Sequence, residues 1–116
     1  MEYTKENLEA VRDIIIDLYK EKGRAIYYSE LSEVLEAKGT PLHHRSPKMP
    51  ELLEAISIHE EKNNRGMFSV MVVAKKSRVS GEGFFTLAQQ LGRDFEDPKT
   101  FAEEERKRVS AIWGLV

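Results

Sequence analysis

A run of apolar residues that ends in a cluster of positive charge constrains the fold of this chain most. Residues 67–74, MFSVMVVA, are almost all apolar and include three β-branched valines. This composition predicts a buried strand. Three positive charges follow within four positions, at Lys75, Lys76 and Arg78, and two nearby glycines permit a tight bend. We therefore expect a strand that leads into a solvent-facing basic turn.

Apolar residues at helical spacing predict two helices before residue 40, with a short strand between them. The first helix is expected to run from a Thr4 cap to a Gly23 stop. The short strand covers residues 25–27. The second helix occupies residues 30–38, with Ser29 as its expected cap.

Three more helices are predicted after residue 40. One covers residues 46–62, and another covers residues 84–91 and is stopped by Gly92. The last opens at Asp97 and Pro98, a cap followed by a first-turn proline. Its expected apolar face comprises Phe101, Val109, Ile112 and Trp113.

The predicted elements follow the order helix, short strand, helix, helix, strand, basic turn and two helices. This is the order of a winged helix with a C-terminal helical extension. We expect an α+β, winged-helix-like fold in a single domain over residues 1–116, with residues from about 84 to 116 packed on the core. A chain of 116 residues is long enough for one core without metal or disulfide staples.

Composition excludes several classes of chemistry. The chain has no cysteine, which removes disulfides, thiolate nucleophiles and cysteine-ligated zinc. Its first residues are charged and amphipathic rather than signal-like, and no run is long enough to cross a bilayer. We therefore expect a cytoplasmic protein with no membrane partner. A formal net charge of -2 means that any contact with DNA must come from a local basic patch.

Two local patches are candidates for contact with DNA phosphates. The wing cluster is Lys75, Lys76 and Arg78, and the loop cluster is His43, His44, Arg45 and Lys48. Four glutamates in the predicted helix over residues 46–62 would repel phosphates, so we expect only its first turn to meet DNA. Of the aromatic residues, Tyr28 is the one most expected to be exposed, where it would stack on a base or contact a phosphate, and the favoured alternative is a half-buried tyrosine. The predicted nucleic-acid-binding residues are therefore Tyr28, His44, Arg45, Lys48, Lys75, Lys76 and Arg78. The alternative for the wing cluster is an ordinary solvated turn.

Neither a metal site nor a catalytic group is indicated. His43, His44 and His59 lack the spacing of a preformed metal face, and a site would need help from Glu60 or Glu61. The glutamates at 103–105 have the pattern of a solvated helix face. No cofactor is therefore expected.

The segment RAIYYSELSEVL, residues 24–35, resembles the helix-turn-helix entry of the O6-alkylguanine alkyltransferase family. The likeness continues loosely through a further helix into the valine-rich strand and its glycine-containing turn. That family transfers an alkyl group to the cysteine of a proline-cysteine-histidine-arginine motif. This chain has neither the cysteine nor the motif, which excludes alkyl transfer. The resemblance implies a winged-helix-like scaffold, for which DNA is the usual ligand.

The sequence thus favours a non-enzymatic DNA-binding or regulatory domain that contacts phosphates through a basic wing. Two alternatives stay open. One is a protein-interaction or homodimerisation module, which the acidic third helix suits better. The other is a small hydrolase or nuclease, which would need His43, His44 or His59 to converge with carboxylates in a cleft.

Overall fold

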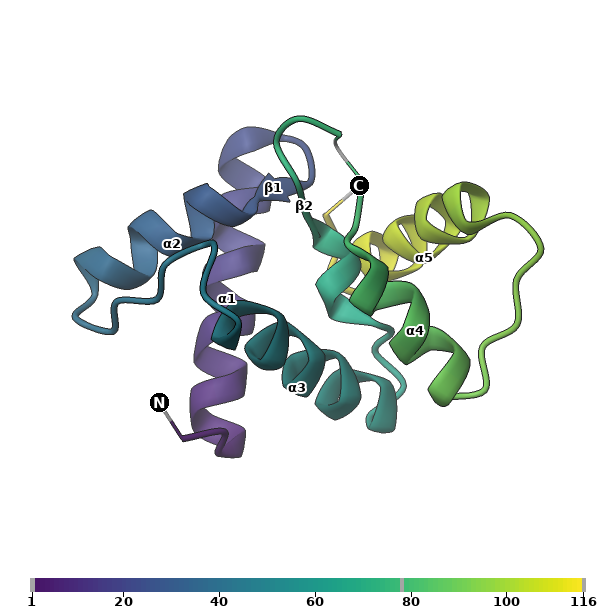
Figure 1. Cartoon of the computed structure of the whole chain (residues 1–116), viewed down its shortest axis with the longest axis horizontal. Coiled ribbons are helices and arrows are strands. Elements are labelled where there is room, and N and C mark those ends of the chain that lie inside the picture. The colour runs from purple at the N-terminus through teal and green to yellow at the C-terminus, as the bar shows by residue number, and fades with distance from the viewer. Residues whose placement is uncertain (1, 78, 116) are drawn as a thin grey trace.

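The computed structural model describes residues 2–77 and 79–115, and over these residues the chain is mostly helical (Figure 1). A small sheet of two short strands joins the helices. The elements in chain order are α1 (Lys5–Lys22), β1 (Ile26–Tyr27), α2 (Tyr28–Ala37), α3 (Lys48–Lys62), the 3₁₀ helix η1 (Phe68–Met71), β2 (Val72–Val73), α4 (Glu82–Gln90) and α5 (Pro98–Ile112). None of the helices in this part of the chain has the length and apolar character needed to span a membrane.

The ends of α1 and α5 form as their residue types predict. Thr4 accepts a hydrogen bond from the Asn7 N–H at 3.1 Å, and Gly23 ends α1 in the left-handed region at φ 68°. Asp97 caps α5 by accepting from the Thr100 N–H, with Pro98 in the first turn. Local sequence is therefore enough to set these boundaries.

The second helix begins two residues before the predicted start, and Ser29 is not its cap. Tyr27 of β1 runs directly into α2, and its N–H donates to the Glu30 carboxylate at 2.8 Å. Arg24 holds the same carboxylate with two hydrogen bonds of 3.0 Å. Because a side chain three residues ahead supplies the acceptor, the helix needs no hydroxyl cap at Ser29.

The apolar segment over residues 67–74 is mostly not a strand, which corrects the prediction. Its first part forms η1, and only Val72 and Val73 are extended. Every residue from 67 to 73 is buried, and in a continuous apolar run the periodicity cannot separate a strand from a buried helical turn. Side chains from neighbouring helices satisfy the backbone, because Ser57 accepts from the Ser69 N–H and Arg106 donates to the Val70 carbonyl.

The two strands pair in parallel, with Ile26 opposite Val72 and Tyr27 opposite Val73. Parallel strands end at the same edge of a sheet, so the turn after β2 leaves beside the start of α2. The Ala74 N–H donates to the Val79 carbonyl at 3.1 Å and closes that turn. The sheet thereby brings the beginning of α2 and the turn after β2 to one end of the molecule (Figure 1).

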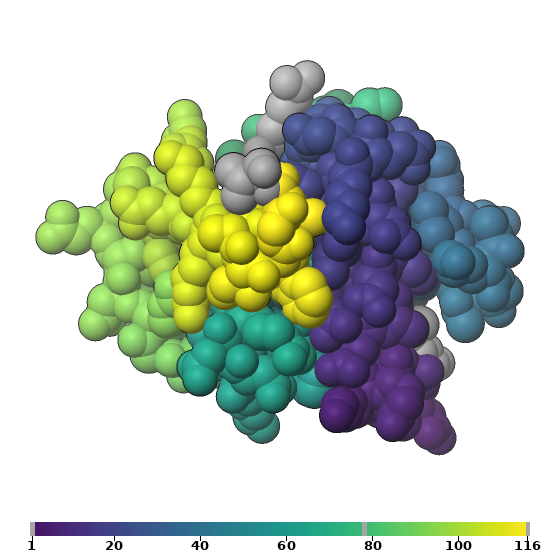
Figure 2. All heavy atoms as spheres, turned by 180° about the vertical axis from the view of Figure 1, so that it is seen from behind, coloured from purple at the N-terminus to yellow at the C-terminus, as the bar shows by residue number. Residues whose placement is uncertain are grey.

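The C-terminal helices pack against the core, as expected. Phe84, Phe101 and Val109 are buried, and Trp113 meets Phe68 edge to face with ring centroids 6.3 Å apart. Ile112, expected on the apolar face of α5, is 42% exposed. In the view from behind, α1 and the C-terminal part of α5 lie side by side (Figure 2).

Candidate functional site

A pocket of about 320 Å³ lies between α2, α3 and α4 and is called here the α2–α4 pocket. Its walls are largely apolar, and the apolar side chains among them are Met49, Pro50, Leu53, Phe84 and Leu87. Tyr28 and His44, both predicted from the sequence as DNA contacts, also line it. Two residues 16 positions apart in the chain thus meet at one concave surface.

Tyr28 is half-buried in the pocket wall, which agrees with the favoured alternative for this residue rather than with full exposure. It is the first residue of α2, and the parallel sheet brings residue 81 to the same end of the molecule. A Cβ placed on Gly81 would lie 3.5 Å from the Tyr28 hydroxyl oxygen. Burial raises the pKa of Tyr28, although a backbone hydrogen bond at Gly81 acts in the opposite direction. The phenol is therefore neutral and held in place at ordinary pH.

A pair of hydrogen-bonded serines, Ser57 on α3 and Ser69 in η1, brings a hydroxyl group to the pocket wall. Ser57 is fully buried on α3, and its Oγ accepts from the Ser69 N–H at 2.9 Å. The two hydroxyl oxygens are 2.7 Å apart, and Ser69 lines the pocket. Sequence reasoning missed this pair, because the two serines are 12 residues apart and neither belongs to a motif. The pair gives the apolar pocket a fixed polar group.

The first turn of α4 supplies backbone donors to the same pocket. Gly81 precedes the helix without a side-chain cap, and Gly81, Glu82 and Gly83 all line the pocket. The first N–H groups of a helix have no partner inside the helix and carry its positive partial charge. The pocket therefore combines apolar walls, a tyrosine, a serine hydroxyl and a helix N-terminus.

The remaining members of the loop cluster divide around the start of α3. Arg45 and Lys48 are exposed, and Lys48 lines a different hollow of about 540 Å³ together with Tyr3 and Glu51. His43 stacks on His44 with ring centroids 4.3 Å apart. His44 therefore faces the α2–α4 pocket, whereas the side chains of Arg45 and Lys48 are exposed to solvent.

The wing cluster lies apart from this loop. Lys75 and Lys76 are exposed in the turn after β2, at the top of the view in Figure 1, whereas the loop between α2 and α3 lies lower, beside α2. Arg78, the third predicted member, lies outside the described residues. The structure therefore brings Tyr28 and His44 together but does not bring Lys75 and Lys76 to the same pocket.

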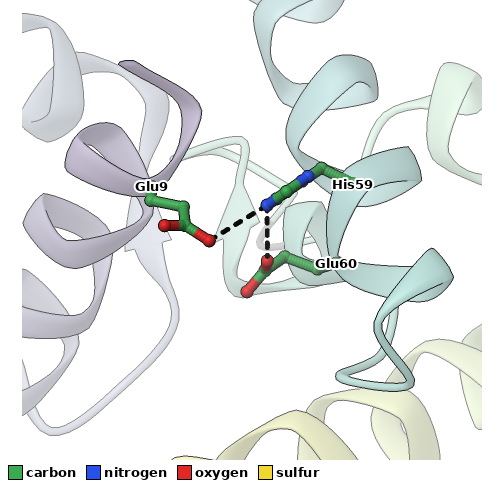
Figure 3. A group of neighbouring side chains, drawn as sticks. All are labelled: Glu9, His59 and Glu60. Carbon is green, nitrogen blue, oxygen red and sulfur yellow. Dashed lines mark hydrogen bonds and ion pairs between the residues drawn. The ribbon is translucent and has the colours of Figure 1, made fainter. Parts of the chain in front are cut away.

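Glu9, His59 and Glu60 form a separate polar cluster between α1 and α3 (Figure 3). The His59 Nε2 atom is 3.1 Å from Glu9 Oε2 and 3.8 Å from Glu60 Oε2. The hydrogen bond to His59 lowers the pKa of Glu9. Among the described residues this is the one group in which three potential ligand atoms come together, and it includes Glu60, one of the two glutamates that the sequence analysis offers as partners for a histidine metal site.

Arginine side chains already form ion pairs with these carboxylates. Arg65 Nη2 is 2.6 Å from Glu60 Oε2, and Arg12 Nη1 is 3.4 Å from Glu60 Oε1. Glu60 is fully buried, so it has no water to replace a lost partner. A divalent cation would have to displace guanidinium groups from the same oxygens. The cluster is best described as an ion-pair network that fastens α1 to α3.

Glu105 is a buried carboxylate that corrects the expectation of a solvated face at residues 103–105. It is 2% exposed and accepts from the Met67 N–H at 2.8 Å and from Arg93 Nη2 at 2.7 Å. Burial alone would raise the pKa of Glu105, but the hydrogen bonds from Arg93 and Met67 outweigh it and lower the pKa overall. Its donors are all structural, so this carboxylate links α5 to the segment before η1 rather than forming a catalytic site.

Comparisons with protein-family models, with curated proteins and with solved structures found no match. The chemistry of the α2–α4 pocket and its surroundings is therefore the basis for assigning a function.

Proposed function

We propose that this chain is a non-enzymatic, winged-helix-like domain that binds DNA with the face formed by α2, α3, α4 and the turn after β2. The order of elements supports this, because three α-helices, η1 and two short strands precede a basic turn that is closed by the hydrogen bond between the Ala74 N–H and the Val79 carbonyl. Lys75 and Lys76 are exposed and free of described ion pairs within residues 2–77 and 79–115. Such lysines suit phosphates, which position a protein on DNA without reading its sequence.

The observation that carries the proposal is the α2–α4 pocket. A phosphate is a poor occupant, because most of the wall is apolar and Glu54 and Glu82 add negative charge. A nucleic-acid base is a better one, since bases are planar, largely apolar on their faces and bordered by hydrogen-bonding groups. A volume of about 320 Å³ is at the lower end of the range, about 300–1,000 Å³, of small-ligand sites.

We infer that the pocket receives a base turned out of the helical stack. Tyr28 and Phe84 supply aromatic surface, and the Ser69 hydroxyl and the first N–H groups of α4 supply hydrogen-bond donors. Proteins that take a base out of the duplex hold it between aromatic and apolar side chains and bond to its edge. Arg45, Lys48, Lys75 and Lys76 would then hold the flanking phosphates.

A duplex with a single 2-aminopurine tests this function, because the fluorescence of that base rises when it leaves the stack. We expect an increase with the wild-type protein and a loss of the increase with Gly83→Leu. Gly83 lines the pocket, and a Cβ at this position meets no atom within 4 Å, so the added side chain has room to obstruct the pocket without strain. Gln89→Leu places the same leucine side chain at an exposed position of α4 outside the pocket and is the control. Equal fluorescence for all three proteins on bound DNA would contradict base capture.

A protein-interaction module is the second candidate, and the acidic rim of the pocket favours it. Glu54 and Glu82 are exposed beside apolar walls, an arrangement that fits a partner with a basic residue next to an apolar one. This candidate predicts self-association or capture of a basic peptide without DNA binding. Light scattering on the purified chain distinguishes a homodimer from a monomer.

A further inference from the structure

A further pocket lies between α1 and α5, which are neighbours in the view from behind (Figure 2). It has a volume of about 290 Å³ and is called here the α1–α5 pocket. Tyr19, Glu103, Arg106, Lys107, Ser110 and Leu115 line it. None of these residues lines the α2–α4 pocket, so any ligand here would be independent of the proposed DNA contact.

Arg106 is held rigidly at this pocket. Its Nε and Nη2 atoms both donate to the carbonyl oxygen of Val70, at 3.1 and 3.0 Å. Val70 is fully buried in η1, so its carbonyl fixes the guanidinium from the inside of the fold. The Nη1 edge takes no part in these two bonds.

The charge of Arg106 lacks a carboxylate within 4.0 Å among the residues that the structure describes. Five other arginines have one, namely Arg12, Arg24, Arg65, Arg93 and Arg108. Burial lowers the pKa of Arg106, while Tyr19 and Glu103 offset that effect only at longer range. A neutral carbonyl satisfies donors but does not neutralise a partly buried positive charge.

Other donors surround this charge. Ser110 is buried, and its hydroxyl donates to the Tyr19 hydroxyl oxygen at 3.4 Å. This hydrogen bond holds the Tyr19 ring of α1 against α5. Lys107 adds an exposed ammonium at the rim. Glu103 is also exposed and brings negative charge to the same rim, which weakens the attraction for an anion but does not cancel two cations.

We propose that the α1–α5 pocket binds a small oxyanion, a carboxylate or a phosphate monoester, with the Arg106 guanidinium as its principal contact. A guanidinium presents donors in a planar fork that matches two oxygens of such a group. The Tyr19 hydroxyl, which accepts from Ser110, provides a further donor, and the Lys107 ammonium lies at the rim. The bound oxyanion supplies the negative charge that Arg106 lacks.

Titration of the ¹⁵N-labelled full chain with methyl phosphate and with acetate, at constant ionic strength, tests the proposal by NMR. We expect saturable shifts of the Arg106 Nε–H signal and of amides near Tyr19 and Ser110. Arg106→Lys keeps the charge but loses the fork, and we expect binding about tenfold weaker. Glu103→Gln removes repulsion, leaves Arg106 intact and should tighten binding.

Lys107→Gln should weaken binding, whereas Lys99→Gln, the same change at an exposed position of α5 outside the pocket, should not. Saturable shifts support an oxyanion site. Non-saturable shifts, or equal affinities for wild type and Glu103→Gln, would overturn it and leave Arg106 as a support for Val70 alone.

Discussion

At the scale of single residues, the buried carboxylates determine how the elements are joined. Glu60 and Glu105 each lie next to other glutamates in the chain, and such runs are usually solvated. Their partners come from distant positions, since Arg12 reaches Glu60 from α1 and Arg93 reaches Glu105 from the segment after α4. Sequence alone does not reveal such pairings. A weak signal existed for Glu105, which is four residues from both Phe101 and Val109 and therefore shares their face of α5.

Replacing Glu105 tests its role as a structural link. Glu105→Gln keeps an acceptor for the Met67 N–H but removes the charge that holds Arg93, and we expect a loss of about 2 kcal/mol in the free energy of unfolding. Glu104→Gln, the same change at the exposed neighbour, should cost less than about 0.5 kcal/mol. Urea unfolding at neutral pH measures both. Equal losses of unfolding free energy for the two variants would show that the contacts of Glu105 with Met67 and Arg93 do not stabilise the fold.

The same comparison has a defined pH dependence. The pKa of Glu105 is lowered in the folded protein from its ordinary 4.5, so its contribution is complete above that value and is lost as pH falls through the lowered pKa. The stability gap between wild type and Glu105→Gln should therefore be constant near neutrality and narrow in acid. Urea unfolding at a series of pH values checks this. A gap that widened in acid would mean that the folded protein favours the protonated carboxyl group.

At the scale of elements, the ends of α1 and α5 were predictable, whereas the start of α2 and the form of the apolar segment were not. Thr4, Gly23 and Asp97 act within one helical turn, so their effects can be read from neighbouring residues. Residues 67–74 were predicted as a strand, but most of them lack strand partners, and η1 forms where Ser57 and Arg106 satisfy the backbone. Because those partners come from other helices, no local pattern could distinguish η1 from a strand. The α2–α4 pocket was unpredictable for the same reason, although two of its residues had been selected.

The turn between α3 and η1 provides a test of how closely α5 packs on this segment. Gly66 has φ 86°, and a Cβ there would lie 2.9 Å from Val109 Cγ2 and 3.3 Å from Glu105 Oε2. Gly66→Ala combines backbone strain of about 1–2 kcal/mol with overpacking of about 1–3 kcal/mol. Gly92→Ala, at φ 78° with no atom within 4 Å of the added Cβ, should lose only the backbone part. Thermal unfolding of the two variants measures the difference, and equal losses would show that α5 does not press on this turn.

At the scale of the whole molecule, the order of helices and the two-strand sheet give a mostly helical body in which the α2–α4 pocket and the α1–α5 pocket share no lining residue. The α2–α4 pocket lies on the face that also carries the start of α3, and the parallel strands bring the start of α2 to the same end as the turn after β2. The α1–α5 pocket lies between two helices that are neighbours in the view from behind (Figure 2). DNA binding at the first face remains a prediction, because a net charge of -2 gives no general attraction to DNA and a local patch must account for it.

The salt dependence of DNA binding tests this prediction most directly. Fluorescence anisotropy over a range of salt concentrations gives the slope of log affinity against log salt for wild type, for Lys75→Ala with Lys76→Ala, and for Lys5→Ala with Lys99→Ala. The control pair removes the same charge from exposed positions on α1 and α5. Each lost phosphate contact changes the slope by about 0.9, so the wing variant should have a slope shallower by about two, and the control should match wild type. Undetectable binding, or equal slopes for all three proteins, would contradict DNA recognition by this face.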